Sequence, residues 1–139
     1  MRREPALAVL SEVRARRSAG GEPPLNPYTD VLVSGVVEHR EEIDEQLSTF
    51  AIGWTLDRMP VVDRNILRLG AFELLYATAV PTGVAVSEAV VLAKDLSTDE
   101  SPRFINGLLS RLAQLRASAD QADQEEPASQ ASEPLEEPV

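Results

Sequence analysis

The stretch PVVDRNILRLGAFELLYAT, residues 60–78, is the most apolar part of the chain and indicates the kind of fold to expect. Between Ile66 and Tyr76, only Arg68 and Glu73 are charged. A helix that is apolar on most of its sides has to be surrounded by other elements. The stretch therefore predicts a central helix enclosed on most sides.

Helical patterns continue on the C-terminal side of this helix. Pro81 and Gly83 interrupt the chain, and residues 84–96 then form an amphipathic pattern. Ser101-Pro102 combines a capping residue with a proline suited to a first helical turn, which predicts the start of a last helix. Its apolar positions recur every three or four residues, and its expected buried stripe consists of Ile105, Leu108, Leu109 and Leu112.

Two further helices are expected on the N-terminal side. Residues 5–17 form one helical pattern, which the Gly- and Pro-containing segment SAGGEPPL at residues 18–25 ends. Asn26-Pro27 then predicts the start of a long helix that runs to about residue 50. His39 falls on its apolar stripe and is interpreted as a packed or boundary histidine rather than a catalytic one. The stripe consists of Tyr28, Leu32, Val36, Ile43, Leu47 and Phe50.

These patterns predict an all-α fold of five helices joined by short loops, because no stretch shows the alternation typical of a strand. The length of 139 residues suits one domain. We place the helical domain at residues 1–117. Residues 118–139 are rich in Glu, Asp, Gln, Ser, Ala and Pro, and we expect them to form a disordered acidic tail.

The charge is unevenly distributed. The formal net charge of −10, from 23 acidic and 13 basic side chains, by itself argues against binding to nucleic acid. Residues 120–139, however, hold seven acidic and no basic side chains, so residues 1–119 carry 16 acids and 13 bases, a net of −3. The first twenty residues hold five arginines against two glutamates.

Several classes of function are not expected. The chain has no cysteine and one histidine, which excludes thiolate and multi-histidine metal sites. No Gly-rich phosphate loop follows a strand, and no nucleophile lies beside a histidine base. No apolar run is long enough to span a bilayer, and the start does not resemble a signal peptide. A cytoplasmic protein that is not an enzyme and needs no cofactor is therefore expected.

At residues 53–77 (GWTLDRMPVVDRNILRLGAFELLYA) and 80–112 (VPTGVAVSEAVVLAKDLSTDESPRFINGLLSRL), the sequence resembles the NusB family of bacterial transcription antitermination factors. The family's elements occur in order: Val-Asp-Arg with Ile-Leu-Arg, Glu-Leu, Glu-Ala, Leu-Ala-Lys and Phe-Ile-Asn-Gly-Leu-Leu. The resemblance covers residues 26–116.

The resemblance implies an all-helical domain of two packed helical subdomains. It also implies a scaffold that binds the boxA element of nascent ribosomal RNA transcripts together with NusE, a small-subunit ribosomal protein. This pair would assemble a complex with NusA, NusG and RNA polymerase. Some family members dimerise, so a homodimer is an open alternative. A NusB-like appendage of an RNA cytosine methyltransferase is disfavoured, because an acidic tail follows the domain in place of a cofactor-binding domain.

The resemblance also implies roles for single residues. The residues expected to contact or face RNA are Leu96, Glu100, Arg103 and Phe104, with Arg103 as a phosphate contact and Glu100 as a charge that repels RNA. For Phe104, base stacking and a place in the core are both open. The residues expected at the partner-binding surface are Asp63, Arg64, Glu88 and Lys94. Asp63 could equally be a first-turn acid that stabilises the helix dipole.

The N-terminus departs from the family pattern. NusB proteins normally begin with an arginine-rich helix, and this chain lacks about twenty residues there, roughly one helix. We favour a misassigned start codon. One alternative is a shortened protein-interaction module that has lost RNA binding. Another is a rearranged RNA site in which Arg2, Arg3 and the arginines at residues 14–17 take the place of that helix.

Overall fold

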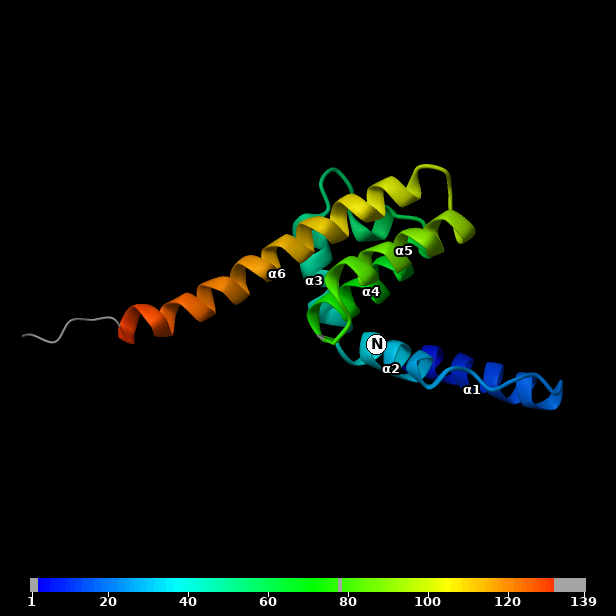
Figure 1. Ribbon diagram of the computed structural model, residues 1–139. Helices are drawn as coiled ribbons and strands as arrows, with labels where there is room; N and C mark the ends of the chain where they lie inside the picture. The colour runs from blue at the N-terminus through cyan, green and yellow to red at the C-terminus, as the bar shows by residue number, and fades with distance from the viewer. Residues whose placement is uncertain (1–2, 78, 132–139) are drawn as a thin grey trace, which may run out of the picture.

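The computed structural model describes the backbone of residues 3–77 and 79–131 and the side chains of residues 5–77 and 79–119. The described residues form helices and no strand, which confirms the predicted all-α fold (Figure 1). The elements are α1 (Arg3–Ala19), α2 (Pro27–Glu38), α3 (Arg40–Phe50), the 3-10 helix η1 (Leu56–Arg58), α4 (Val61–Leu75), α5 (Thr82–Leu96) and α6 (Ser101–Ala131).

Helix α4 is the centre of the fold, as the sequence predicted. It packs against α2, α3, α5 and α6. Small residues bring the neighbours close: a Cβ at Gly70 would lie 2.6 Å from Cδ1 of Leu109 and 3.5 Å from Cβ of Ala89. The stripe predicted for α6 is buried in this core. It comprises Ile105, Leu108, Leu109 and Leu112.

The predicted long helix over residues 26–50 is wrong as a single element, because the chain bends at His39. Helix α2 ends at Glu38 and α3 begins at Arg40, and His39 between them has φ −105° and ψ 19°. The bend lets both helices turn their apolar sides toward α4. The His39 ring stacks on Tyr76 with 4.0 Å between ring centroids, which agrees with its interpretation as a packed histidine.

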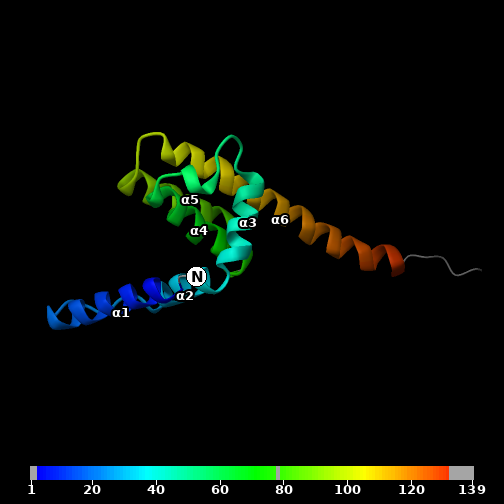
Figure 2. The same ribbon diagram turned by 180° about the vertical axis from the view of Figure 1, so that it is seen from behind.

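Helices α1 and α2 lie side by side and project from the bundle of α4, α5 and α6 (Figures 1 and 2). Asn26 caps α2 as predicted, since its side chain accepts a hydrogen bond from the Tyr28 amide at 2.9 Å. An ion pair between Arg14 and Asp30 joins α1 to α2. The Tyr28 hydroxyl then joins α2 to the bundle by donating to Glu73 at 2.7 Å.

Helix α6 is longer than the sequence predicted. Its backbone is helical to Ala131, whereas disorder was expected from residue 118. Alanine, glutamine and glutamate favour helix, and a helix that is already anchored in the core extends without a new nucleation step, although Pro127 disfavours its last part. Among the described side chains of α6, the last one in the buried core is Leu112. Residues 132–139 of the predicted tail lie outside the described residues.

Over the part of the chain that the structure describes, no helix combines the length and the apolar character needed to cross a membrane.

The contact between Gly35 and Phe72 gives a test of the α2–α4 packing. A Cβ at Gly35 would lie 2.2 Å from Cε1 of the buried Phe72 ring, whereas a Cβ at Gly83 in α5 would meet nothing within 4 Å. We expect Gly35→Ala to lower the free energy of unfolding by about 1–3 kcal/mol through overpacking. The control Gly83→Ala should raise it by up to about 1 kcal/mol, because alanine favours helix. Urea unfolding measures both, and equal stability of the two variants would contradict the packing.

Two tyrosines give a test at high pH. Burial, together with the hydrogen bond and the charge of Glu73, raises the pKa of Tyr28 to about 12. Burial and the same interactions with Glu42 raise the pKa of Tyr76 to about 12. Since the folded pKa lies above the unfolded value of about 10, this stabilisation is complete below pH 10 and is lost as the pH rises toward 12.

We therefore expect tyrosinate absorbance in the folded protein to appear with a midpoint near pH 12. The chain has two tyrosines, so Tyr28→Phe leaves only Tyr76 to titrate and assigns each value. The melting temperature of this variant should fall less steeply between pH 10 and 12. A midpoint near pH 10 in folded protein would rule out the two hydrogen bonds.

Candidate nucleic-acid interface

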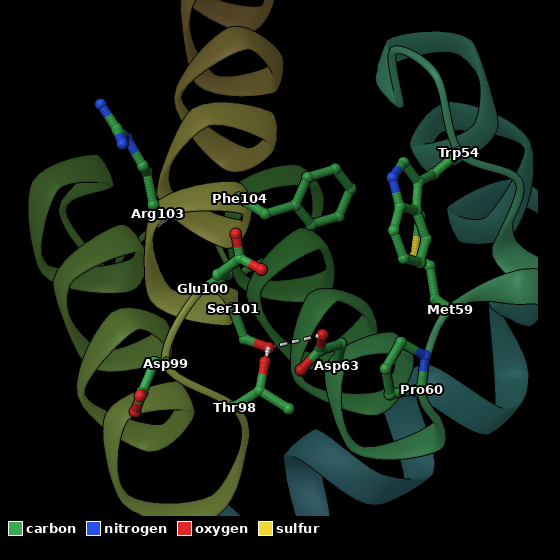
Figure 3. A pocket seen from close by; sticks show the side chains of 10 residues that line it. All are labelled: Trp54, Met59, Pro60, Asp63, Thr98, Asp99, Glu100, Ser101, Arg103 and Phe104. Atoms are coloured by element: carbon green, nitrogen blue, oxygen red, sulfur yellow. Dashed lines mark hydrogen bonds between the residues drawn. The ribbon is translucent and has the colours of Figure 1, made fainter.

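A pocket of ≈ 450 Å³ lies between the segment that leads into α4 and the start of α6 (Figure 3). One side consists of the loop after α3 and the first turn of α4, and the other consists of the α5–α6 loop and the first turn of α6. The residues that line it are Trp54, Met59, Pro60, Asp63, Thr98, Asp99, Glu100, Ser101, Arg103 and Phe104.

Asp63 holds the two sides of the pocket together. Its side chain is 5% exposed, and its Oδ2 accepts a hydrogen bond from the Ser101 hydroxyl at 2.8 Å. Its Oδ1 accepts a second hydrogen bond from the Ser97 hydroxyl. The Thr98 and Ser101 hydroxyl oxygens lie 2.7 Å apart and share a further hydrogen bond. Asp63 thus fixes the α5–α6 loop, and with it the start of α6, against the start of α4.

Two aromatic rings face each other across the pocket. The centroids of Trp54 and Phe104 lie 6.0 Å apart, and their planes are inclined by 45°. Figure 3 shows the two rings pointing toward one another from the loop after α3 and from α6. Phe104 packs against the core but is only half-buried, so part of its ring remains accessible. Trp54 is 50% exposed.

The charged side chains lie at the rim. Asp99, Glu100 and Arg103 are all exposed. In Figure 3, Arg103 points away from the two rings, on the other side of the α6 backbone. The guanidinium group of Arg103 therefore lies apart from the aromatic part of the pocket (Figure 3).

The structure brings together three of the residues predicted to bind RNA, namely Glu100, Arg103 and Phe104. Leu96, at the end of α5, is 61% exposed and does not line the pocket. Arg3 is described by its helical backbone only, and Arg2 lies outside the described residues. The contribution of these three residues to RNA binding stays a prediction.

The four residues predicted at the partner surface fall into two groups. Asp63 is buried as described, and Arg64 Nη1 donates to the Leu56 carbonyl at 3.2 Å, so both hold the fold together here. Glu88 and Lys94 are exposed on α5, and Lys94 lines a second groove of ≈ 570 Å³ between α5 and α6. Their contacts with a partner protein stay predictions.

Sequence reasoning missed Trp54 as a site residue. The signal that could have found it is the position of the chain's one tryptophan directly after Gly53, in a loop rather than on a helical stripe. Gly53 adopts φ +83°, which favours glycine, and so lets the chain turn just before the indole. Among the described side chains, no group of three histidines, cysteines or carboxylates is placed to hold a metal ion.

Replacing Asp63 tests its role in holding the pocket. Asp63→Ala leaves the buried Ser101 hydroxyl without its acceptor, and we expect a loss of about 1–3 kcal/mol in the free energy of unfolding. Asp99→Ala removes an exposed carboxylate from the same loop and should change it by less than about 0.5 kcal/mol. Urea unfolding of the two variants makes the comparison, and equal stabilities would contradict the role of Asp63.

Comparisons with known proteins agree with this fold. The profile of the NusB family matches residues 2–114. The transcription antitermination protein NusB of Thermobifida fusca is 63% identical over 109 residues, which are 78% of this chain and 77% of that protein. The one of a Nocardioides species is 57% identical over 118 residues, 85% and 84% of the two chains.

A solved structure, T. maritima NusB, is 31% identical with a TM-score of 0.61, and the match covers 82% of this chain and 91% of that chain. The family profile spans α1 to the packed part of α6, and the identity to the relatives is well above 30% over most of both lengths. The chain therefore belongs to the NusB family, whose relatives are named transcription antitermination proteins.

Proposed function

We propose that this chain is a transcription antitermination scaffold that binds boxA RNA of nascent ribosomal RNA transcripts together with NusE. In this function it helps to assemble NusA and NusG on RNA polymerase and catalyses no reaction itself. The observation that carries the proposal is the pocket at the start of α6, where Glu100, Arg103 and Phe104 occur together. A cytoplasmic location follows from this function.

The chemistry of the pocket suits single-stranded RNA. Unpaired bases of RNA are bound by stacking on aromatic side chains, and Phe104 offers a ring at the pocket wall. Phosphates are bound by arginine, and Arg103 is exposed at the rim. The net charge of −10 does not oppose this proposal, because seven of the acidic side chains lie in residues 120–139, and residues 1–119 carry a net charge of only −3.

The contact with NusE is assigned to the exposed residues of α5. Glu88 and Lys94 are free to reach a partner, whereas Asp63 and Arg64 make hydrogen bonds within the chain. We therefore propose that Asp63 and Arg64 support the partner surface by fixing α4, and that direct contacts come from α5.

Glu100 provides the test of the RNA site. Its exposed carboxylate lies at the pocket rim and should repel phosphates. We expect Glu100→Gln to tighten binding of a boxA oligonucleotide by up to about five-fold at low salt, about 1 kcal/mol. The gain should shrink as salt is added, because exposed charges are screened.

Glu45→Gln makes the same change of charge at an exposed position of α3 that does not line the pocket, and it should leave the affinity unchanged. Fluorescence anisotropy with a labelled boxA RNA measures the affinity of the unchanged protein and of the two variants. Unchanged or weaker binding by Glu100→Gln would refute this placement. Failure of the unchanged protein to bind boxA RNA while it still binds NusE would favour the alternative, a protein-interaction module without RNA binding.

A further inference from the structure

The half-exposed indole of Trp54 is not explained by the packing of the fold. It lies in the loop after α3, where the neighbouring Ile52 is 71% exposed. Singly exposed apolar side chains are common on protein surfaces, so it is the place of Trp54 beside a pocket, and not its exposure alone, that points to a bound ligand. Unlike Ile52, Trp54 lines the pocket at the start of α6.

The arrangement around Trp54 fits a flat, neutral group. The indole and the Phe104 ring form the walls, and Met59, which is buried, lies next to Trp54 (Figure 3). At 6.0 Å the two rings are already at the spacing of an aromatic pair, so a ligand stacks on the open side of Trp54 rather than between the rings.

The charges around the pocket separate a base from a phosphate. Asp99 and Glu100 lie at the rim and repel a phosphate, but they do not repel an uncharged base. Arg103 points away from the rings on the other side of α6, where it can meet the RNA backbone. This division, with a base on the aromatic side and phosphate on the arginine side, is typical of proteins that bind single strands.

From this geometry, and resting on the proposed RNA binding, we infer that Trp54 is a base-stacking residue: one unpaired base of the bound RNA stacks on the exposed face of its indole. The loop after α3 thus forms part of the RNA site together with α6. None of the residues assigned to RNA from the sequence lies in this loop.

Trp54 reports on its own surroundings, because it is the one tryptophan of the chain. We expect its fluorescence to be quenched when single-stranded boxA RNA is added, with the same midpoint as anisotropy of labelled RNA. Unchanged fluorescence at saturating RNA would overturn the inference and leave the proposed function standing. Quenching by NusE without RNA, and not by RNA without NusE, would assign Trp54 to a protein contact and also overturn it.

Substitutions separate stacking from a general apolar contact. We expect Trp54→Leu to weaken boxA binding roughly ten-fold, while Trp54→Phe keeps most of the affinity. Ile52→Ala changes a more exposed apolar residue of the same loop and should bind like the unchanged protein. Thermal unfolding of each variant shows that it is folded. Wild-type affinity of Trp54→Leu, or equal losses for leucine and phenylalanine, would overturn stacking.

The dependence on salt gives an independent readout. A stacking residue releases no counterion, so Trp54→Leu should leave the slope of log K against log salt unchanged, whereas Arg103→Gln should reduce its magnitude by about one. A reduced slope in Trp54→Leu would overturn the assignment to a base. Absence of RNA binding by the unchanged protein would refute the proposed function itself, and this inference with it.

Discussion

The buried carboxylate of Asp63 is the interaction on which the candidate site depends. A carboxylate removed from water is tolerated only when its oxygens accept hydrogen bonds, and Asp63 accepts them from Ser97 and Ser101. These bonds join the first turn of α4 to the loop that begins α6. Because Phe104 lies one turn into α6, the same bonds set its position opposite Trp54. The two hydrogen bonds of this one carboxylate therefore help to hold the two sides of the aromatic pocket in place.

The helices around α4 could be predicted from the sequence because their periodicity is local and continuous. Periodicity fails at His39, where the apolar spacing of Tyr28 to Phe50 runs through the bend without interruption. The bend depends on tertiary contacts, with Phe72 against Gly35 and Tyr76 against His39, which no local pattern contains. The end of α6 was predicted too early for a related reason. Composition predicts whether a segment can form a core, but a helix that is anchored at one end also extends beyond its packed part without a new nucleation step.

The sequence could reveal only those residues of the candidate site that lie close together in the chain. Glu100, Arg103 and Phe104 belong to one short segment, and the family resemblance named them together. Trp54 lies in a loop that precedes α4 in the sequence, far from Phe104 in the chain, and only the fold brings the two rings together. Asp63 shows the opposite case, since the family resemblance assigned it to the partner surface, whereas both of its oxygens accept hydrogen bonds within the chain. A residue type in a motif does not reveal whether its side chain is already engaged.

The pairing of α1 with α2, apart from the bundle, has a consequence for how the protein opens. Helix α1 has most of its apolar side chains partly or fully exposed and packs mainly on α2, so separating it leaves the core of α4, α5 and α6 covered. Its amide protons should then exchange with solvent through a local opening that requires less free energy than global unfolding. We therefore expect α1 to open at a lower free energy than the core of α4, α5 and α6. Such an opening would leave the Asp63 contacts and the aromatic pocket in place, because neither involves α1.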